Sequence, residues 1–129
     1  MLQIGVIGEA SETVSSANTA ETMKSGTLQV YATPAMVALM EQAAYTSVQN
    51  KLDVGQGTVG VRMEVSHISA TPLNGTVTAK SRLVSVDRRK LVFEVEAFDE
   101  EGKIGEGIHE RFIVDNKGFQ EKAENKRKG

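Results

Sequence analysis

Three side chains in this sequence of 129 residues have the types and spacing to act on one activated carbonyl group: Thr33, Glu41 and His67. A carboxylate and an imidazole move protons, and a hydroxyl group at the start of a helix stabilises a developing oxyanion. The elements predicted below would bring all three between one helix and one sheet. The combination indicates hydrolysis of an activated carbonyl compound.

Each of these residues also has an ordinary structural explanation. His67 could be a buried imidazole that satisfies its hydrogen bonds in the core. Glu41 could be a solvated residue at the edge of an apolar helix face. Thr33 could simply be the N-cap of the helix. Taken one at a time, the structural explanations are the simpler ones.

One segment, Thr33 to Asn50, is predicted to be a long helix. Thr33 suits the N-cap and Pro34 suits the first helical position, where no amide donor is needed. Several residues share one face at a spacing of 3.6: Met36, Val37, Met40, Ala43, Ala44, Ser47 and Val48. Because several of them are small, we expect another element to pack closely against this face, with Glu41 at its edge.

After Thr58 the apolar period changes to two, which is typical of strands with one buried face. Four such segments follow one another: 58–67, 76–86, 91–97 and 103–115. The alternation is unbroken from Val59 to His67, so His67 is expected to point toward the helix. The last segment loses its alternation around Gly105 and Gly107, which predicts a bulge. Residues 3–7 and 11–14 could form an edge strand.

One helix among antiparallel strands defines an α+β fold, because parallel strands would need further crossover helices. We predict an antiparallel sheet of about five strands wrapped around the long helix, in a single domain over residues 1–115. Residues 116–129 carry five basic and two acidic side chains and are expected to be a frayed basic tail. The small open sheet leaves an edge strand, which predicts a homodimer, or a tetramer built from two dimers.

The composition excludes several functions. Fifteen Lys and Arg against 17 Asp and Glu give a net charge of −2, so we expect no nucleic-acid partner. With no Cys and only two His, a disulfide framework and a thiolate or multi-histidine metal site are excluded. No charged leader precedes Lys24, and the longest apolar run is too short to span a bilayer. We therefore predict a cytoplasmic protein without membrane contact.

Two charged segments are weaker candidates for a site. Arg88, Arg89 and Lys90 could hold the phosphates of a ligand, or form the solvated tip of a hairpin. His109 and Arg111 share one face of the last strand, and both are expected to be exposed to solvent.

Three motifs occur in a fixed order: VYATPAMVALME at 30–41, VSHISATP at 65–72 and GIHER at 107–111, with Gly60 between the first two. Together they resemble the fluoroacetyl-CoA thioesterase-like group of the hotdog-fold thioesterases, from about residue 14 to residue 114. The resemblance implies a hotdog fold, a dimer and an active site at the subunit interface. The implied activity is hydrolysis of a small or short-chain acyl-CoA thioester to free acid and CoA.

The same resemblance assigns roles to residues. The catalytic Thr, Glu and His of the family fall on Thr33, Glu41 and His67. It leaves open whether Glu41 attacks the carbonyl group or activates water, and it implies no metal and no cofactor apart from the CoA of the substrate. The predicted substrate contacts are Gly60, Met36, Arg88, Arg89 and Lys90.

One stretch departs from the family. Its fluoroacetyl-CoA enzymes carry a Phe-rich lid before the helix, whereas residues 23–30, MKSGTLQV, contain no Phe. This argues against fluoroacetyl selectivity and favours another small or short-chain acyl group. Three alternatives stay open. One is a non-catalytic acyl-CoA-binding module, and another is a hotdog enoyl-CoA hydratase or dehydratase, for which the sequence lacks a paired Asp and His. The third is a dimeric scaffold without a ligand.

Overall fold

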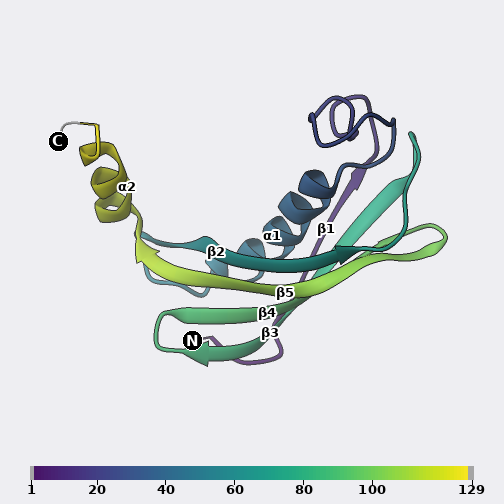
Figure 1. Ribbon diagram of the computed structural model, residues 1–129. Helices are drawn as coiled ribbons and strands as arrows, with labels where there is room; N and C mark the ends of the chain where they lie inside the picture. The colour runs from purple at the N-terminus through teal and green to yellow at the C-terminus, as the bar shows by residue number, and fades with distance from the viewer. Residues whose placement is uncertain (1, 128–129) are drawn as a thin grey trace.

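Five antiparallel strands form one curved sheet around a long helix in the computed structural model, which describes residues 2–127 (Figure 1). In chain order the elements are β1 Ile7–Thr13, α1 Thr33–Gln49, β2 Gln56–His67, β3 Thr76–Asp87, β4 Lys90–Asp99, β5 Gly102–Asp115 and α2 Asn116–Asn125. The strand order is β1-β3-β4-β5-β2, so β1 and β2 are the edges of the sheet. This is the predicted α+β architecture, with one continuous strand where two short N-terminal pieces were expected.

The buried face of α1 forms the centre of the core. Its buried side chains are Ala35, Met36, Leu39, Met40, Ala43, Ala44 and Val48. Strand β1 lies so close to this face that a Cβ on Gly8 would fall inside contact distance of the Ala43 carbonyl oxygen and of Ser47. The predicted close packing against the small residues of the helix is thereby confirmed, and β1 is the element that packs there.

Replacing Gly8 by Ala is expected to destabilise the fold by about 1–3 kcal/mol, because the added methyl group must push β1 away from α1. The new Cβ would also lie 2.7 Å from the Ser81 hydroxyl oxygen. Urea unfolding measures the effect. Gly26→Ala is the matched control, since its Cβ would meet nothing closer than Ala20 at 3.5 Å. Equal unfolding midpoints for the two variants would contradict the packing described.

Two strands contain bulges that bear on the site. In β5 the pairs Ala97↔Gly105 and Phe98↔Lys103 leave Ile104 without a partner, which confirms the bulge predicted near Gly105. In β2 the register shifts between Gly60 and Arg62, so Val61 is the extra residue. The prediction of unbroken alternation was wrong at Val61, which is 53% exposed. A bulge adds one residue to the strand, and for this reason both Gly60 and His67 face α1.

The segment before α1 folds back against the chain that follows β2. Val30 forms an isolated bridge with Pro72, and the Tyr31 amide donates to the Thr71 carbonyl oxygen at 2.9 Å. Tyr31 is buried, and its hydroxyl donates to the Glu12 carboxylate. Burial, with this carboxylate, raises the pKa of Tyr31. These contacts fix the start of α1 beside the end of β2.

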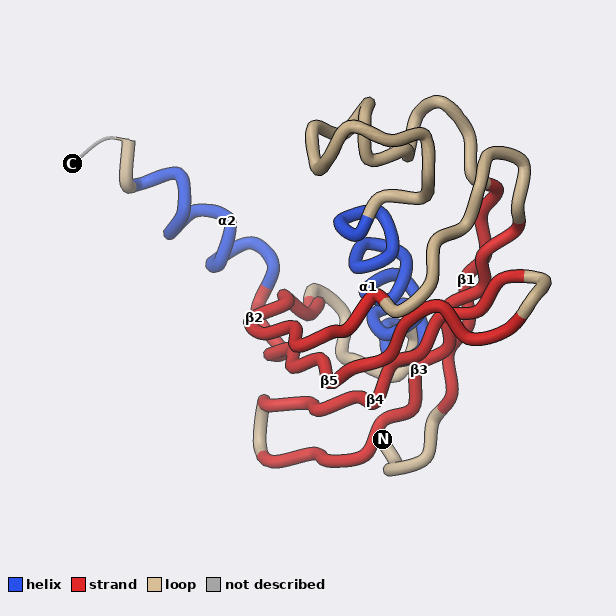
Figure 2. The backbone as a smooth tube through the Cα atoms, turned by 45° about the vertical axis from the view of Figure 1, so that its right-hand side comes forward, coloured by secondary structure: helices blue, strands red, loops and turns tan. Residues whose placement is uncertain are grey.

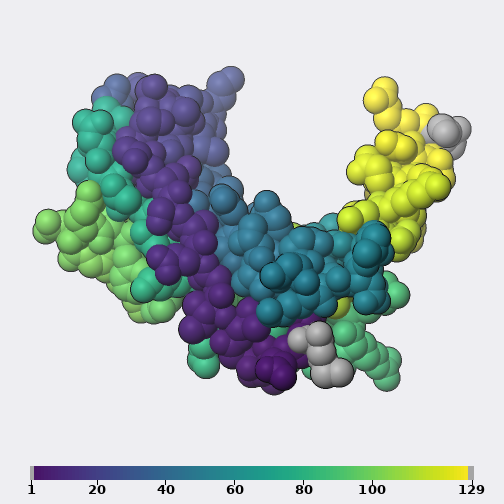
Figure 3. Space-filling view, turned by 180° about the vertical axis from the view of Figure 1, so that it is seen from behind, coloured from purple at the N-terminus to yellow at the C-terminus, as the bar shows by residue number. Residues whose placement is uncertain are grey.

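Residues 116–125 form the helix α2, so the expectation of a frayed tail was wrong. The Asp115 carboxylate caps the helix by accepting a hydrogen bond from the Gly118 amide at 2.9 Å. All ten residues are exposed, and the helix projects from the end of β5, apart from the loop that precedes α1 (Figures 2 and 3). A short polar helix has no apolar stripe, which is why the pattern missed it. Within residues 2–127 no helix has the length and apolar character needed to cross a membrane.

Candidate active site

Thr33 and His67 form a hydrogen-bonded pair at the start of α1. The Thr33 hydroxyl oxygen lies 2.7 Å from Nδ1 of His67 at the end of β2. The predicted N-cap role of Thr33 was wrong: the cap is Ala32, which has the extended backbone, and it makes no side-chain cap bond. The Thr33 hydroxyl is therefore free of the helix end and available to the imidazole.

His67 is held largely neutral by its surroundings. Burial lowers its pKa, and a backbone contact at Ser69 opposes this shift. Its Nε2 is buried and has no hydrogen-bond partner within the part of the chain that the structure describes. Buried polar atoms in native proteins normally have a partner. The hydrogen-bonding capacity of Nε2 is therefore unused within the described chain.

A pocket of about 270 Å³ lies beside this pair. Its lining residues are Ala20, Ser25, Val30, Tyr31, Thr33, His67, Ile68, Ser69 and Ala70. The walls come from the segment before α1 and from the end of β2, and they are mostly small or apolar. This composition suits a small acyl group next to the imidazole.

Glu41 belongs to a second cluster, about two helical turns along α1 from Thr33. Its Oε2 accepts a hydrogen bond from Nη1 of Arg111 at 3.1 Å. A Cβ on Gly60 would lie 2.5 Å from the same oxygen, so the glycine leaves the space that the carboxylate occupies. The side chain of Glu41 is 39% exposed, as expected for a residue at the edge of the apolar face. The side chain of Glu41 is therefore partly open to solvent.

His109 and Arg111 were expected to be exposed, and this was wrong because both are buried. Register explains their burial, because His109 lies opposite Met63 of β2 and Phe93 of β4, whose side chains pack in the core. Burial lowers the pKa of Arg111, and Glu41 opposes the shift. Burial also lowers the pKa of His109, and the positive charge of Arg111 adds to this effect. The GIHER motif was the one sequence signal that marked these residues.

The first cluster, Thr33 and His67, does not meet the second cluster, Glu41, His109 and Arg111, within one chain. Among residues 2–127 no hydrogen bond or ion pair joins Glu41 to Thr33 or His67. A strand rises about 3.3 Å per residue, so Gly60 and His67 lie roughly 20 Å apart along β2. One chain therefore supplies two halves of the predicted site and does not join them.

The remaining predicted substrate contacts lie elsewhere. Met36 is fully buried in the core, where it packs on Gly105, and it does not line the pocket. Its role as a substrate contact stays a prediction. Arg88 and Arg89 form the turn between β3 and β4, and the ammonium group of Lys90 lies 3.5 Å from the Glu110 carboxylate. None of these three cations contacts either cluster among the interactions of the described residues. Their role toward phosphates stays a prediction.

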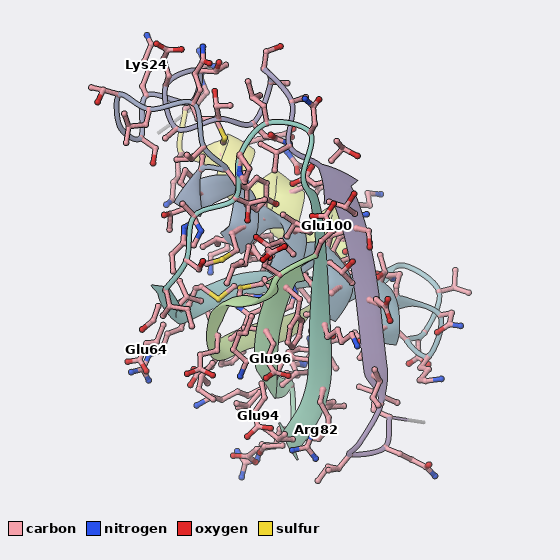
Figure 4. All side chains as sticks on the ribbon, turned by 90° about the vertical axis from the view of Figure 1, so that its right-hand side faces the viewer. Lys24, Glu64, Arg82, Glu94, Glu96 and Glu100 are labelled. Carbon is pink, nitrogen blue, oxygen red and sulfur yellow. The ribbon has the colours of Figure 1, made fainter. Side chains whose placement is uncertain are left out.

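A larger hollow of about 780 Å³ lies against strand residues away from both clusters. It is lined by charged side chains that include Glu64, Lys80, Arg82, Glu94 and Glu96, four of which are labelled in Figure 4. It contains no residue of either cluster, so the smaller pocket is the one that belongs to the candidate site.

A curved five-stranded antiparallel sheet around one helix is the architecture of the hotdog proteins. A hot-dog-like protein from Thermanaerovibrio acidaminovorans superimposes on the chain with a TM-score of 0.86 at 24% identity, over 95% of this chain and 91% of that one. This likeness shows the fold alone.

Closer relatives identify the family. The profile described as fluoroacetyl-CoA-specific thioesterase matches residues 14–117. The fluoroacetyl-CoA thioesterase of Streptantibioticus cattleyicolor is 39% identical over 98 residues, 76% of this chain and 70% of the relative. A structure of the fluoroacetyl-CoA thioesterase FlK superimposes with a TM-score of 0.92 at 31% identity, over 98% of each chain. The chain belongs to the fluoroacetyl-CoA-specific thioesterase family of hotdog hydrolases.

Proposed function

We propose that this chain hydrolyses a small or short-chain acyl-CoA thioester to the free acid and CoA. The observation that carries the proposal is the Thr33–His67 pair beside a small pocket, with the imidazole Nε2 buried and without a partner among the described residues. An imidazole kept neutral by burial suits proton transfer near pH 7. Membership of a thioesterase family supports the same reaction.

A second copy of the chain completes the site in this proposal. Strand β2 is an edge of the sheet, so its outer side is free to pair with another strand. Opposite residues in an antiparallel pair point to the same face. If two β2 strands pair about a two-fold axis at Glu64, Val65 faces Met63 of the partner subunit. Because Val61 is bulged, His67 then lies opposite Gly60 of the partner subunit.

This register brings the two clusters together. Gly60 touches Glu41, so the partner subunit's Glu41 would approach the unpaired side of His67. Each dimer would contain two sites, each with Thr33 and His67 from one subunit and Glu41 from the other. Within each chain Arg62 forms an ion pair with Glu64, which offsets the repulsion between the two glutamates at the axis.

Each of these residues has a separate role in the proposed reaction. The Glu41 carboxylate attacks the carbonyl carbon, or removes a proton from a water molecule that attacks it. The first helical amides of α1 and the Thr33 hydroxyl would stabilise the oxyanion. The carbon–sulfur bond then breaks, and His67 passes to the CoA thiolate the proton that the water molecule loses, so that the imidazole is neutral again at the end of the cycle. When Glu41 is the nucleophile, a water molecule hydrolyses the resulting anhydride and regenerates the carboxylate.

The pocket and the segment around it set the substrate size in this proposal. Walls of Ala20, Ser25 and Ala70 suit a short acyl chain, and no Phe from residues 23–30 is available to cover it. Arg88, Arg89 and Lys90 are proposed to bind CoA phosphates. Cytoplasmic location is retained as a prediction from the sequence.

Release of free thiol from a panel of acyl-CoAs tests the function. The panel runs from acetyl to decanoyl and includes fluoroacetyl and one aromatic acyl group. We expect cleavage of at least one short member, and its loss in Glu41→Ala. Hydration of an enoyl-CoA without thiol release would support the hydratase instead. Binding of CoA with no reaction on any member would support the non-catalytic module.

The proposed dimer register predicts a specific disulfide. The sequence contains no Cys, so a single introduced thiol has no competitor. Glu64 lies on the exposed side of β2 (Figure 4), and in Glu64→Cys the two thiols would be directly opposite, within the 4.4–6.8 Å Cα separation that a disulfide needs. Mild oxidation is expected to give a covalent dimer on non-reducing gels. Ser66→Cys is the control, because its two copies would be roughly 13 Å apart. Cross-linking of Ser66→Cys alone would refute the register.

A further inference from the structure

The buried guanidinium of Arg111 is held on three sides. Its Nε donates to the Thr58 hydroxyl at 2.8 Å, and its Nη2 donates to the Thr58 carbonyl oxygen at 3.0 Å. Its Nη1 lies 3.1 Å from both Glu41 Oε2 and His109 Nε2. One nitrogen of Arg111 therefore meets the carboxylate of the site and an imidazole that the proposed mechanism does not use.

The partners of His109 determine which ring nitrogen carries the proton. Arginine only donates hydrogen bonds, so Nε2 of His109 must present its lone pair to Arg111. The other nitrogen, Nδ1, lies 2.8 Å from the Arg62 carbonyl oxygen, which only accepts. Nδ1 must therefore carry the hydrogen. The geometry allows a single state of His109, the neutral tautomer with its proton on Nδ1.

The surroundings of His109 support this neutral state. Phe93 of β4 stacks on the ring with centroids 6.2 Å apart. The charged groups that face the ring are Arg111 of β5 and Glu41 of α1, whose Oε2 is 3.9 Å from Nε2, while Glu110 acts on it from the opposite face of β5. A second proton would have to sit on Nε2, where it would meet an N–H group of Arg111.

We propose that His109 is a positioning residue, which accepts one hydrogen of Arg111 Nη1 so that the other is aimed at Glu41. Without this acceptor the guanidinium loses one of the contacts that set its rotation, and the hydrogen bond to Glu41 is no longer fixed in direction. The hydrogen bonds of His109 and Arg111 would orient the Glu41 carboxylate toward a substrate beside Gly60. The inference therefore rests on the proposed function.

Two variants of His109 separate its two hydrogen bonds. In His109→Gln the amide oxygen reaches the position of Nε2 and still accepts from Arg111. In His109→Asn the shorter amide reaches only the position of Nδ1, donates to the Arg62 carbonyl oxygen and leaves Arg111 without an acceptor. We expect His109→Asn to lower kcat by about 10²-fold with KM little changed, since misplacement of a catalytic group acts on the chemical step. His109→Gln is expected to recover most of that loss.

Nuclear magnetic resonance detects the hydrogen-bonded states of His109 and Arg111 without any substrate. We expect the ring nitrogens of wild-type His109 to show the Nδ1-protonated neutral tautomer at pH 7. The Nη resonances of Arg111 should be separate in the wild type and in His109→Gln, and averaged by rotation in His109→Asn. An Nε2-protonated ring or an imidazolium would overturn the proposal, as would equal kcat values for the two variants.

The two proposals fail in different ways. If the wild type cleaves no acyl-CoA, the proposed function fails, and the resonances of His109 and Arg111 still decide whether the network exists. If the wild type is active and both variants match it, the function stands and the positioning role of His109 is refuted. A His109→Asn protein that does not fold is replaced by the wild-type tautomer measurement, which needs no variant.

Discussion

Mixing two inactive variants, Glu41→Gln and His67→Asn, is expected to restore about a quarter of the wild-type activity. Each variant alone should lose at least about 10²-fold in kcat, because each removes a group that transfers a proton or attacks the carbonyl carbon. Random exchange of subunits makes half of the dimers mixed. In each mixed dimer one of the two sites has wild-type Glu41 and wild-type His67, and the other has neither. Thiol release after co-refolding of the two proteins measures the recovery.

A matched pair controls for non-specific rescue. Thr33→Val and His67→Asn alter the same half of the site, so a mixed dimer contains no site in which both residues are wild type. That mixture should stay inactive. Recovery in both mixtures, or in neither, would refute the site shared between subunits, provided that each protein melts within a few degrees of the wild type.

Gly60→Ala is the second change with a large expected effect. Its Cβ would lie 2.5 Å from Glu41 Oε2 and 3.2 Å from both Arg111 Nη1 and His109 Cε1. The backbone at Gly60 does not require a glycine, and the end of the Glu41 side chain is free to rotate toward solvent. We therefore expect a folded protein in which the carboxylate is displaced, with kcat reduced by about 10²-fold.

A double-mutant cycle tests whether the methyl group acts through the carboxylate. If it does, Gly60→Ala combined with Glu41→Ala should be no less active than Glu41→Ala alone. A further loss in the double variant would show that the methyl group blocks the substrate directly. If Gly60→Ala has the same kcat/KM as the wild type, the position is not as crowded as described.

The positions of Gly60 and His67 explain how the candidate site is divided along one strand. Gly60 and His67 lie on the same edge strand and face the same helix, yet roughly 20 Å of β2 separates them. An antiparallel copy of the strand reverses its direction, which is the simplest way to place the start of one beside the end of the other. The free edge of the sheet and the divided site therefore have one proposed explanation.

The sequence determined the elements and the candidate residues. Apolar periods of 3.6 and 2 predicted α1 and the four long strands to within a few residues, because local burial on one face imposes those periods. The loss of alternation near Gly105 predicted the bulge at Ile104. The family motifs singled out Thr33, Glu41 and His67, whose catalytic roles stay predictions.

Only the tertiary structure decided which groups meet. Alternation along β5 defines two faces but does not say which of them is turned toward the helix, so the burial of His109 and Arg111 could not be predicted from it. The Thr33 hydroxyl could cap a helix or bind an imidazole, and the choice depends on His67, 34 residues away. The bulge at Val61 turns Gly60 toward α1, because pairing with β5 shifts there by one residue. Contacts between distant segments depend on sheet curvature and register, which no local pattern encodes.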